Sequence, residues 1–127
     1  MTNMLCVALG GAVGAVLRYL ASLLIGSAQK GCFPWATFAV NIAGCLAIGL
    51  LAALLAQPAG GVRTEQLRLL LITGVCGGFT TFSTFSRESV ALISEGHMGM
   101  FAAYAAGSVA LGLAAVVAGM WAGRALA

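Results

Sequence analysis

The sequence predicts an all-α integral membrane protein with four transmembrane helices, and three observations lead to this fold class. The 127 residues are 61% hydrophobic and 7% charged, whereas a soluble domain carries about 25% charged residues. Apolar residues fill four windows that each reach the roughly 20 residues a helix needs to span hydrocarbon. Only short polar connectors separate these windows. We therefore expect a single membrane domain over residues 1–127.

The four expected spans follow one another without a linker, a charge run or a low-complexity stretch. The connectors read GSAQKGCFP, QPAGGVRTEQ and EGHMG, and they contain the glycine, proline and polar residues that interrupt helices. The first window has no basic segment before it and no small-residue cleavage site after it. We expect a permanent span there and not a signal peptide. The spans cover about residues 4–25, 34–56, 67–94 and 98–123.

The first span combines small residues with one charge. Arg18 lies toward its far end, where the side chain either reaches the membrane interface or forms a vestibule charge that attracts anions. Small residues recur four apart here and in two other spans, which lets helix backbones approach closely. These pairs are Gly10/Gly14, Gly74/Gly78 and Gly119/Gly123.

Uncharged hydrogen-bond donors occupy single faces of the second and fourth spans. Thr37 and Asn41 are four residues apart in the second span, and Tyr104 and Ser108 are four apart in the fourth. Residues at this spacing share a helix face. Unpaired polar groups in hydrocarbon cost several kcal/mol each, so we expect both faces to point to the interior or to a cavity.

The third span contains the run GGFTTFSTFS at residues 77–86, which predicts a break in the helix. Gly77 and Gly78 are followed by residues that can bond back to the chain. Irregular backbone at this depth is tolerated only when it is buried in protein or lines a cavity, and freed carbonyls there often hold a cation. A glycine pair used only for tight packing is the alternative. Beyond the break, Phe82 and Phe85 share one face.

Together these groups indicate a path for a small anion. Hydroxyl and amide groups donate hydrogen bonds without a fixed charge, and aromatic ring edges carry partial positive charge. Conduction requires binding that is strong enough to admit an ion and weak enough to release it. The alternative is that these hydroxyls bond to backbone carbonyls or join helices. We favour the ion path because donors and paired rings occur together.

The basic residues divide evenly between the two sides of the membrane. With the N-terminus, the second connector and the C-terminus on one side, each side has three, so the positive-inside rule selects no orientation. Insertion in both orientations would explain this and would favour an antiparallel dimer; a weak signal from a small count is the other explanation. The residues are Arg63, Arg68 and Arg124 against Lys30, Arg18 and Arg87.

The sequence argues against several other classes of function. The net charge of +3 is small and scattered, which does not suggest a nucleic-acid partner. We expect no enzyme, because paired carboxylates, a nucleophile with its base, a phosphate loop and a Cys/His metal spacing are all missing. The four cysteines are expected to be small apolar residues. His97 is expected to be solvated, and Glu88 is expected to pair with a basic group or cap a helix.

Three stretches resemble the Fluc (CrcB) family of fluoride channels. They are GGAVGAVLRY in the first span, PWATFAVNIAG at the start of the second and GGFTTFSTFS in the third. The resemblance covers all four spans. It implies a passive, fluoride-selective channel that exports fluoride down its gradient and lowers cytoplasmic fluoride. It also implies an antiparallel, dual-topology homodimer with two pathways in the bacterial cytoplasmic (inner) membrane.

The resemblance also implies roles for individual residues in the fluoride pathway. Asn41 corresponds to the family's pathway asparagine, and Phe82 and Phe85 match two phenylalanines whose ring edges face fluoride. The remaining pathway positions fall on Thr37, Tyr104 and Ser108.

Three further positions are carried over from the family, and a fourth departs from it. Gly77 and Thr80 match positions whose backbone carbonyls, two from each subunit, hold a structural sodium ion at the dimer centre. Arg18 is the basic residue of the first motif. Gly112 lies one turn beyond Ser108 and has no hydroxyl where some relatives carry serine, so the far end of the fourth-span donor line is in doubt.

Two other classes of membrane protein are alternatives to the channel. A small dual-topology, proton-coupled multidrug exporter needs a carboxylate embedded in the membrane. The first span contains no acidic residue, and Glu88 and Glu95 lie at or beyond the end of the third span. A packing subunit that transports nothing would make the polar groups dispensable.

Overall fold

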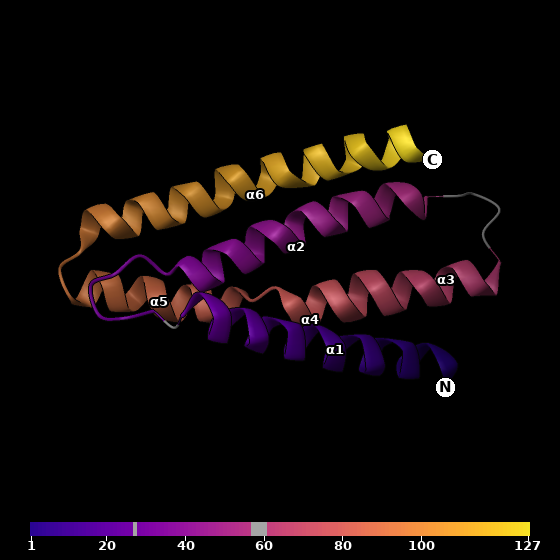
Figure 1. Cartoon of the computed structure of the whole chain (residues 1–127), viewed down its shortest axis with the longest axis horizontal. Coiled ribbons are helices and arrows are strands. Elements are labelled where there is room, and N and C mark those ends of the chain that lie inside the picture. The colour runs from indigo at the N-terminus through magenta and orange to yellow at the C-terminus, as the bar shows by residue number, and fades with distance from the viewer. Residues whose placement is uncertain (27, 57–60) are drawn as a thin grey trace.

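The computed structural model describes residues 1–26, 28–56 and 61–127, and its helices lie side by side in one elongated bundle (Figure 1). Within these residues, four helical stretches are long and apolar enough to cross a membrane, which confirms the predicted all-α class with four candidate spans. The first two are α1 (Thr2–Ile25) and α2 (Trp35–Leu54), and the last is α6 (Met98–Leu126). The third stretch, Val62–Ser94, is divided into several pieces.

The third stretch changes its helical form along its length. It comprises α3 (Val62–Arg68), the π-helix η1 (Leu69–Cys76), the short α4 (Gly77–Phe79) and α5 (Phe82–Ser94). The predicted break is therefore confirmed, with Thr80 and Thr81 extended between α4 and α5. The π-helix was not expected from the sequence, since its apolar run LLLITGVC has no feature that distinguishes it from an ordinary α-helix. π-helical turns are rare and often occur near functional sites.

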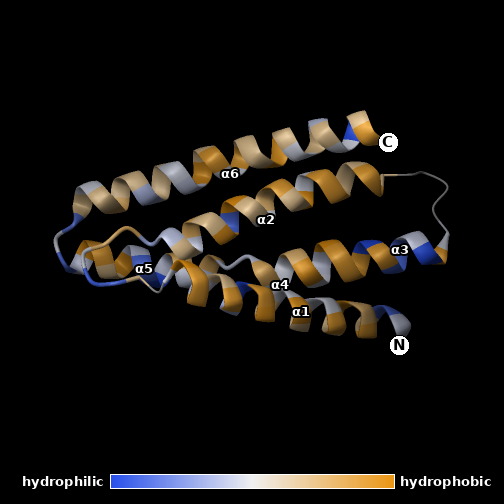
Figure 2. Cartoon of the chain, viewed as in Figure 1, coloured by the Kyte–Doolittle hydropathy of each residue, from blue (hydrophilic) through white to orange (hydrophobic). Residues whose placement is uncertain are grey.

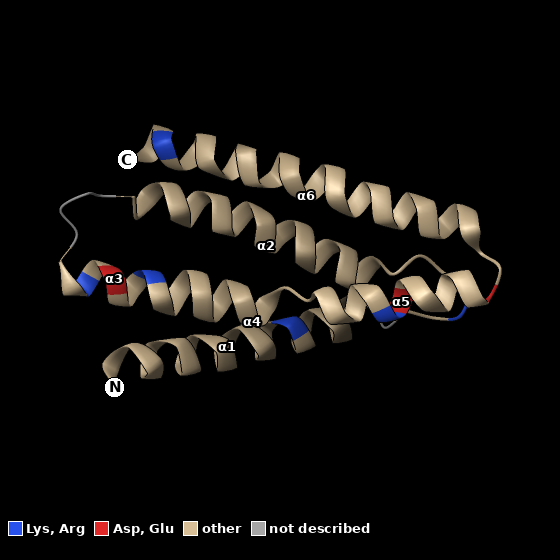
Figure 3. Cartoon of the chain, turned by 180° about the vertical axis from the view of Figure 1, so that it is seen from behind, with Lys and Arg blue, Asp and Glu red and all other residues tan. Residues whose placement is uncertain are grey.

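Both chain termini lie at one end of the bundle, together with the C-terminal end of α2 and the start of α3 (Figure 1). The α1–α2 and α5–α6 connections lie at the opposite end. Lys and Arg occur toward both ends, and one basic residue of α1 lies nearer the middle of the bundle (Figure 3), so the even division of basic residues between two sides stays a prediction. Most of the helical surface between the ends is hydrophobic (Figure 2), and large apolar side chains such as Leu24 and Trp121 are exposed. Lipid is the natural surrounding for this surface.

The two connections at the end opposite the termini are joined by a hydrogen bond. The Gly31 N–H donates to Glu95 Oε2 at 3.1 Å. Gly31 has a φ of +70°, and a Cβ there would lie 2.9 Å from His97 Nε2. A side chain at this position would therefore be strained and would push the exposed histidine away.

Glycine allows α1 to pack directly on the backbone of the third span. A Cβ added to Gly74 would lie 2.7 Å from Gly10 Cα, and one added to Gly78 would lie 2.5 Å from the Gly11 carbonyl oxygen. The same close approach joins α2 to α6, where a Cβ on Gly119 would lie 2.8 Å from the Leu50 amide. The expected use of these glycines for close helix packing is confirmed.

We expect Gly10→Ala to destabilise the bundle, because its methyl group would meet Gly74 Cα at 2.9 Å and the Leu70 carbonyl oxygen more closely still. Overpacking of this kind costs about 1–3 kcal/mol in the free energy of unfolding. Gly11→Ala is the matched control, because a Cβ there meets nothing within 4 Å and alanine gains up to about 1 kcal/mol of helix propensity. Unfolding in detergent measures both variants, and equal effects would contradict this account of the packing.

Candidate functional site

The side chain of Asn41 forms hydrogen bonds with the backbone at the break in the third span. Its Nδ2 donates to the Thr81 carbonyl oxygen at 3.2 Å, and the Thr81 N–H donates to its Oδ1 at 2.8 Å. Thr81 has extended dihedral angles, and its amide donates to this side chain instead of to a helical carbonyl. The amide side chain from α2 therefore forms a hydrogen bond with each backbone group of Thr81. One of its two Nδ2 hydrogens is left for another acceptor.

Thr81 also begins the helix that follows the break. Its Oγ1 accepts from the Thr84 N–H at 3.2 Å and donates to the Thr84 Oγ1 at 3.1 Å. A threonine at this position satisfies one of the amides that have no partner at a helix N-terminus. The break thus lies at Thr80–Thr81, after the two glycines and not at them. Gly77 keeps α-helical angles, and Gly78 serves the close packing against α1.

These two caps release backbone carbonyls on the N-terminal side of the break. In a continuous helix the Gly77 carbonyl would accept from the Thr81 amide, and the Thr80 carbonyl would accept from the Thr84 amide. Both amides donate to side chains instead. Among the described residues, no group of three or more His, Cys, Asp or Glu side chains is placed to hold a metal ion. The Gly77 and Thr80 carbonyls are thus left without the amide donors that a continuous helix would give them.

A buried carboxylate connects α2, α5 and α6. Glu88 accepts from Thr37 Oγ1 at 3.0 Å and from the Tyr104 hydroxyl at 2.8 Å. Glu88 is 8% exposed and Tyr104 is fully buried. Burying a charge is costly unless it is hydrogen-bonded, and these two donors supply one bond to each carboxylate oxygen. Thr37 and Tyr104 each use their only hydroxyl proton in this way.

Glu88, like Thr81, is a site residue that the sequence did not identify. Its expected partner was a basic group or a helix end, whereas its hydrogen-bond partners among the described residues are Thr37 and Tyr104. One signal was present, because Glu88 follows Phe85 by three residues and therefore shares a helix face with it.

Aromatic rings continue from this carboxylate toward the outside of the chain. The ring centroids of Tyr104 and Phe85 are 4.9 Å apart, and those of Phe85 and Phe82 are 5.7 Å apart. Phe82 is 79% exposed. Ser108, one turn from Tyr104, has a buried hydroxyl without a hydrogen-bond partner among the described residues. The described residues therefore leave the proton of this hydroxyl without an acceptor.

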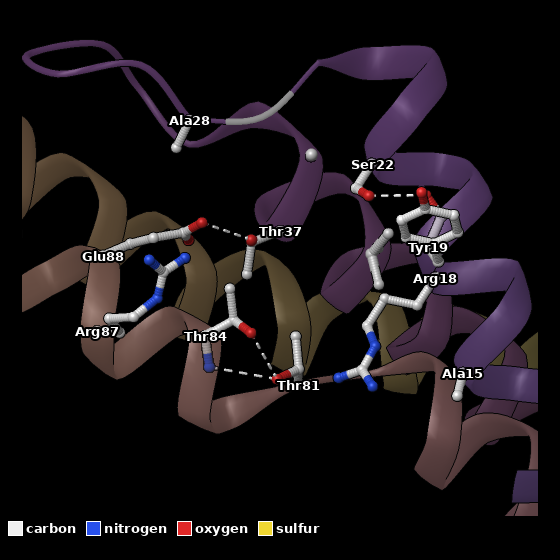
Figure 4. A pocket seen from close by; sticks show the side chains of 12 residues that line it. Ala15, Arg18, Tyr19, Ser22, Ala28, Thr37, Thr81, Thr84, Arg87 and Glu88 are labelled. Atoms are coloured by element: carbon white, nitrogen blue, oxygen red, sulfur yellow. Dashed lines mark hydrogen bonds between the residues drawn. The ribbon is translucent and has the colours of Figure 1, made fainter.

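A cavity of about 490 Å³ opens beside the carboxylate (Figure 4). It lies between α1, α2 and α5, and both polar and charged side chains project from its walls. The hydroxyls of Thr81 and Thr84 lie on one wall, where a hydrogen bond joins them. The residues that bring polar or charged groups to it include Arg18, Thr37, Thr81, Thr84, Arg87 and Glu88.

The predicted pathway residues do not all line one cavity. Thr37 lines the cavity and contacts Glu88. Tyr104 and Phe85 lie behind the carboxylate, with Phe82 at the outer surface. Asn41 is at the break, and Ser108 is further along α6 from Tyr104. At Gly112 an added Cβ would contact Cys45 Sγ at 3.5 Å.

We expect Tyr104→Phe to destabilise the fold, because it leaves one buried oxygen of Glu88 without a donor. The cost of an unsatisfied buried polar group is about 1–3 kcal/mol and is larger for a charged group. Tyr19→Phe is the matched control, since Tyr19 is 62% exposed. The free energy of unfolding measures the effect. If the Tyr104 variant is no less stable than the Tyr19 variant, the hydrogen bond from Tyr104 to Glu88 does not stabilise the fold.

The chain is similar to known proteins over its whole length. The sequence matches the family described as CrcB-like protein, Camphor Resistance (CrcB), over residues 5–120. The fluoride-specific ion channel FluC of Paracoccus denitrificans is 50% identical over 120 residues, which cover 94% of this chain and 93% of its own. That of Phocaeicola vulgatus is 46% identical over 121 residues, with coverage of 95% and 98%. That of Rhizobium johnstonii is 48% identical, with coverage of 100% of both chains.

Proposed function

Because this chain belongs to the CrcB-like family, a family of ion channels and not of enzymes, we propose that it is a passive, fluoride-specific channel. It exports fluoride down its gradient and thereby lowers cytoplasmic fluoride. The observation that carries this proposal is the full-length similarity to relatives named fluoride-specific ion channel FluC. The site supports it with uncharged donors and ring edges next to a polar cavity. The multidrug-exporter alternative has no support in these relatives.

The proposed pathway runs from the cavity along the aromatic rings. Ser108 offers a buried hydroxyl without a partner, and Asn41 retains one amide hydrogen. The ring edges of Phe82 and Phe85 supply partial positive charge between fixed donors. Thr37 and Tyr104 donate to Glu88, so they reach fluoride only when those hydrogen bonds exchange.

A second copy of the chain is proposed to cover the pathway as an antiparallel, dual-topology homodimer with two pathways. Phe82 is 79% exposed, Gly77 is exposed, and Thr80 and Asn41 are half-buried in the isolated chain. Polar groups in the middle of a span are costly against lipid, which favours a protein partner on this face. The even division of basic residues favours insertion in both orientations.

The freed carbonyls fit a structural sodium ion at the dimer centre. Carbonyl oxygens of unwound helices coordinate sodium in membrane proteins, and the amides that would engage the Gly77 and Thr80 carbonyls donate elsewhere. Two carbonyls from each subunit would hold the ion, which would join the two broken spans. A Cβ on Gly77 meets nothing closer than 4.0 Å within the chain, so this position leaves room for a partner.

The relatives compared above come from bacteria, and the chain has four helical stretches able to cross a membrane. These two observations support our proposal that this multi-pass protein lies in the bacterial cytoplasmic (inner) membrane.

Fluoride release from liposomes tests the proposed function. Purified protein is reconstituted into vesicles loaded with potassium fluoride, and valinomycin is added to carry potassium and remove the opposing voltage. We expect rapid fluoride release at a fluoride electrode and little chloride release from matched vesicles. No fluoride release from verified dimers would overturn the channel assignment. Proton-coupled export of cationic drugs would then be assayed in the same vesicles.

A further inference from the structure

Two arginines, Arg18 and Arg87, line the cavity beside Glu88. The proposed pathway gives no role to Arg87. Arg87 of α5 and Arg18 of α1 extend into the surroundings of the cavity from opposite sides (Figure 4). Glu88 is the acidic residue that lines the same cavity. The lining thus carries two positive charges against one negative charge.

The carboxylate does not engage Arg87, although the two residues are adjacent in sequence. Within residues 1–26, 28–56 and 61–127, the hydrogen-bond donors to Glu88 are Thr37 and Tyr104. Glu88 is buried and Arg87 is exposed. The N-terminal end of α5, marked by Thr81, also lines the cavity and contributes partial positive charge. The balance of charge in the cavity therefore favours an anion.

Arg87 also borders a smaller cavity that reaches the connecting loops. This second cavity has a volume of about 110 Å³, and its lining includes Lys30 and Glu95. Arg87 and Glu88 line both cavities. Arg87 thus lies between the charged loops and the larger cavity.

We propose that Arg87 collects fluoride into the cavity beside Glu88, and this inference rests on the proposed channel function. An unneutralised charge in a cleft with low-dielectric walls raises the local concentration of ions of opposite sign. Arg87 acts through this field and not through a directional contact, so a lysine replaces it. The effect weakens as dissolved ions screen the charge.

The test is fluoride current per channel in a planar bilayer of uncharged phosphatidylcholine, with ionic strength as the variable. Fluoride is held constant on both sides, and gluconate, an impermeant anion, raises the ionic strength from about 0.01 M to about 1 M, which shortens the Debye length from about 30 Å to about 3 Å. We expect Arg87→Gln to lower the current by about three- to tenfold at low ionic strength and by less than about 1.5-fold at high ionic strength. Arg87→Lys retains the wild-type current at both.

Arg124→Gln is the matched control, because it removes one positive charge from the last turn of α6, away from the cavity. It is expected to leave the current unchanged. Equal currents for Arg87→Gln and wild type at low ionic strength would overturn the inference. So would an equal loss at both ionic strengths, or a failure of Arg87→Lys to retain the current. If the wild-type protein carries no fluoride current, the proposed function fails and the inference fails with it.

Discussion

Asn41→Asp is expected to reduce fluoride flux by at least about a hundredfold. The new carboxylate oxygen would face the Thr81 carbonyl oxygen where Nδ2 now donates, and two acceptors cannot form this bond. The change also removes the remaining amide hydrogen and introduces a negative charge beside the pathway. A unit charge about 4 Å from an ion contributes about 4 kcal/mol at an effective dielectric constant of about 20. Each 1.4 kcal/mol or so changes a rate about tenfold.

Fluoride release from liposomes measures this effect, and size-exclusion chromatography shows whether the dimer still assembles. Asn3→Asp is the matched control, because it introduces the same charge at an exposed position near the N-terminus. Wild-type flux in the Asn41 variant would remove this residue from the mechanism. A variant that is monomeric or aggregated would assign Asn41 to the stability of the break.

Phe85→Ile is expected to reduce fluoride flux by about tenfold or more. Phe85 occupies the central position in the row of rings, 4.9 Å from Tyr104 and 5.7 Å from Phe82. Isoleucine fills much of the same space but lacks the ring quadrupole that gives an aromatic edge its partial positive charge. The loss of about 1.4 kcal/mol of stabilisation for the passing ion suffices for a tenfold reduction.

Phe82→Ile and Phe79→Ile complete this series in the liposome assay. Phe82 is 79% exposed in the isolated chain, so its replacement costs little packing within one subunit, and we expect a loss comparable to that of Phe85→Ile. Phe79 precedes the break, where its ring would contact a Cβ placed on Gly44 at 3.4 Å. We expect Phe79→Ile to change flux by less than about twofold. Equal losses at all three positions would point to packing and not to ring edges.

The four spans were predictable because the length and polarity of a helix in lipid are strongly constrained. The existence of a break was also predictable, because GGFTTFSTFS concentrates helix-interrupting and hydroxyl residues in one short run. Its exact position was not predictable, because it depends on hydrogen bonds between the Thr81 backbone and the side chain of Asn41, which lies 40 positions earlier in the chain. Local residue preferences do not contain such a contact.

The candidate site was predictable only as separate groups of donors. Spacing placed Thr37 and Tyr104 on interior faces, but it did not show that both hydroxyls meet the same carboxylate. The role of Glu88 depends on three helices coming together, and the cavity next to it depends on α1 as well. The periodicity of a single helix shows which residues share its face, but it does not show which residues of other helices they contact. These contacts between helices are therefore seen only in the folded chain.

The bond between Asn41 and Thr81 has a consequence for how the protein forms in the cell. A third span that has not yet met α2 lacks the amide side chain that engages the Thr81 backbone. In hydrocarbon those backbone groups must find partners within their own segment, so the nascent segment is expected to insert as an unbroken helix. The discontinuity, and the exposed carbonyls with it, then arise only when α2 docks. We therefore expect a newly made chain to lack both the break and its freed carbonyls until α2 and the third span have assembled.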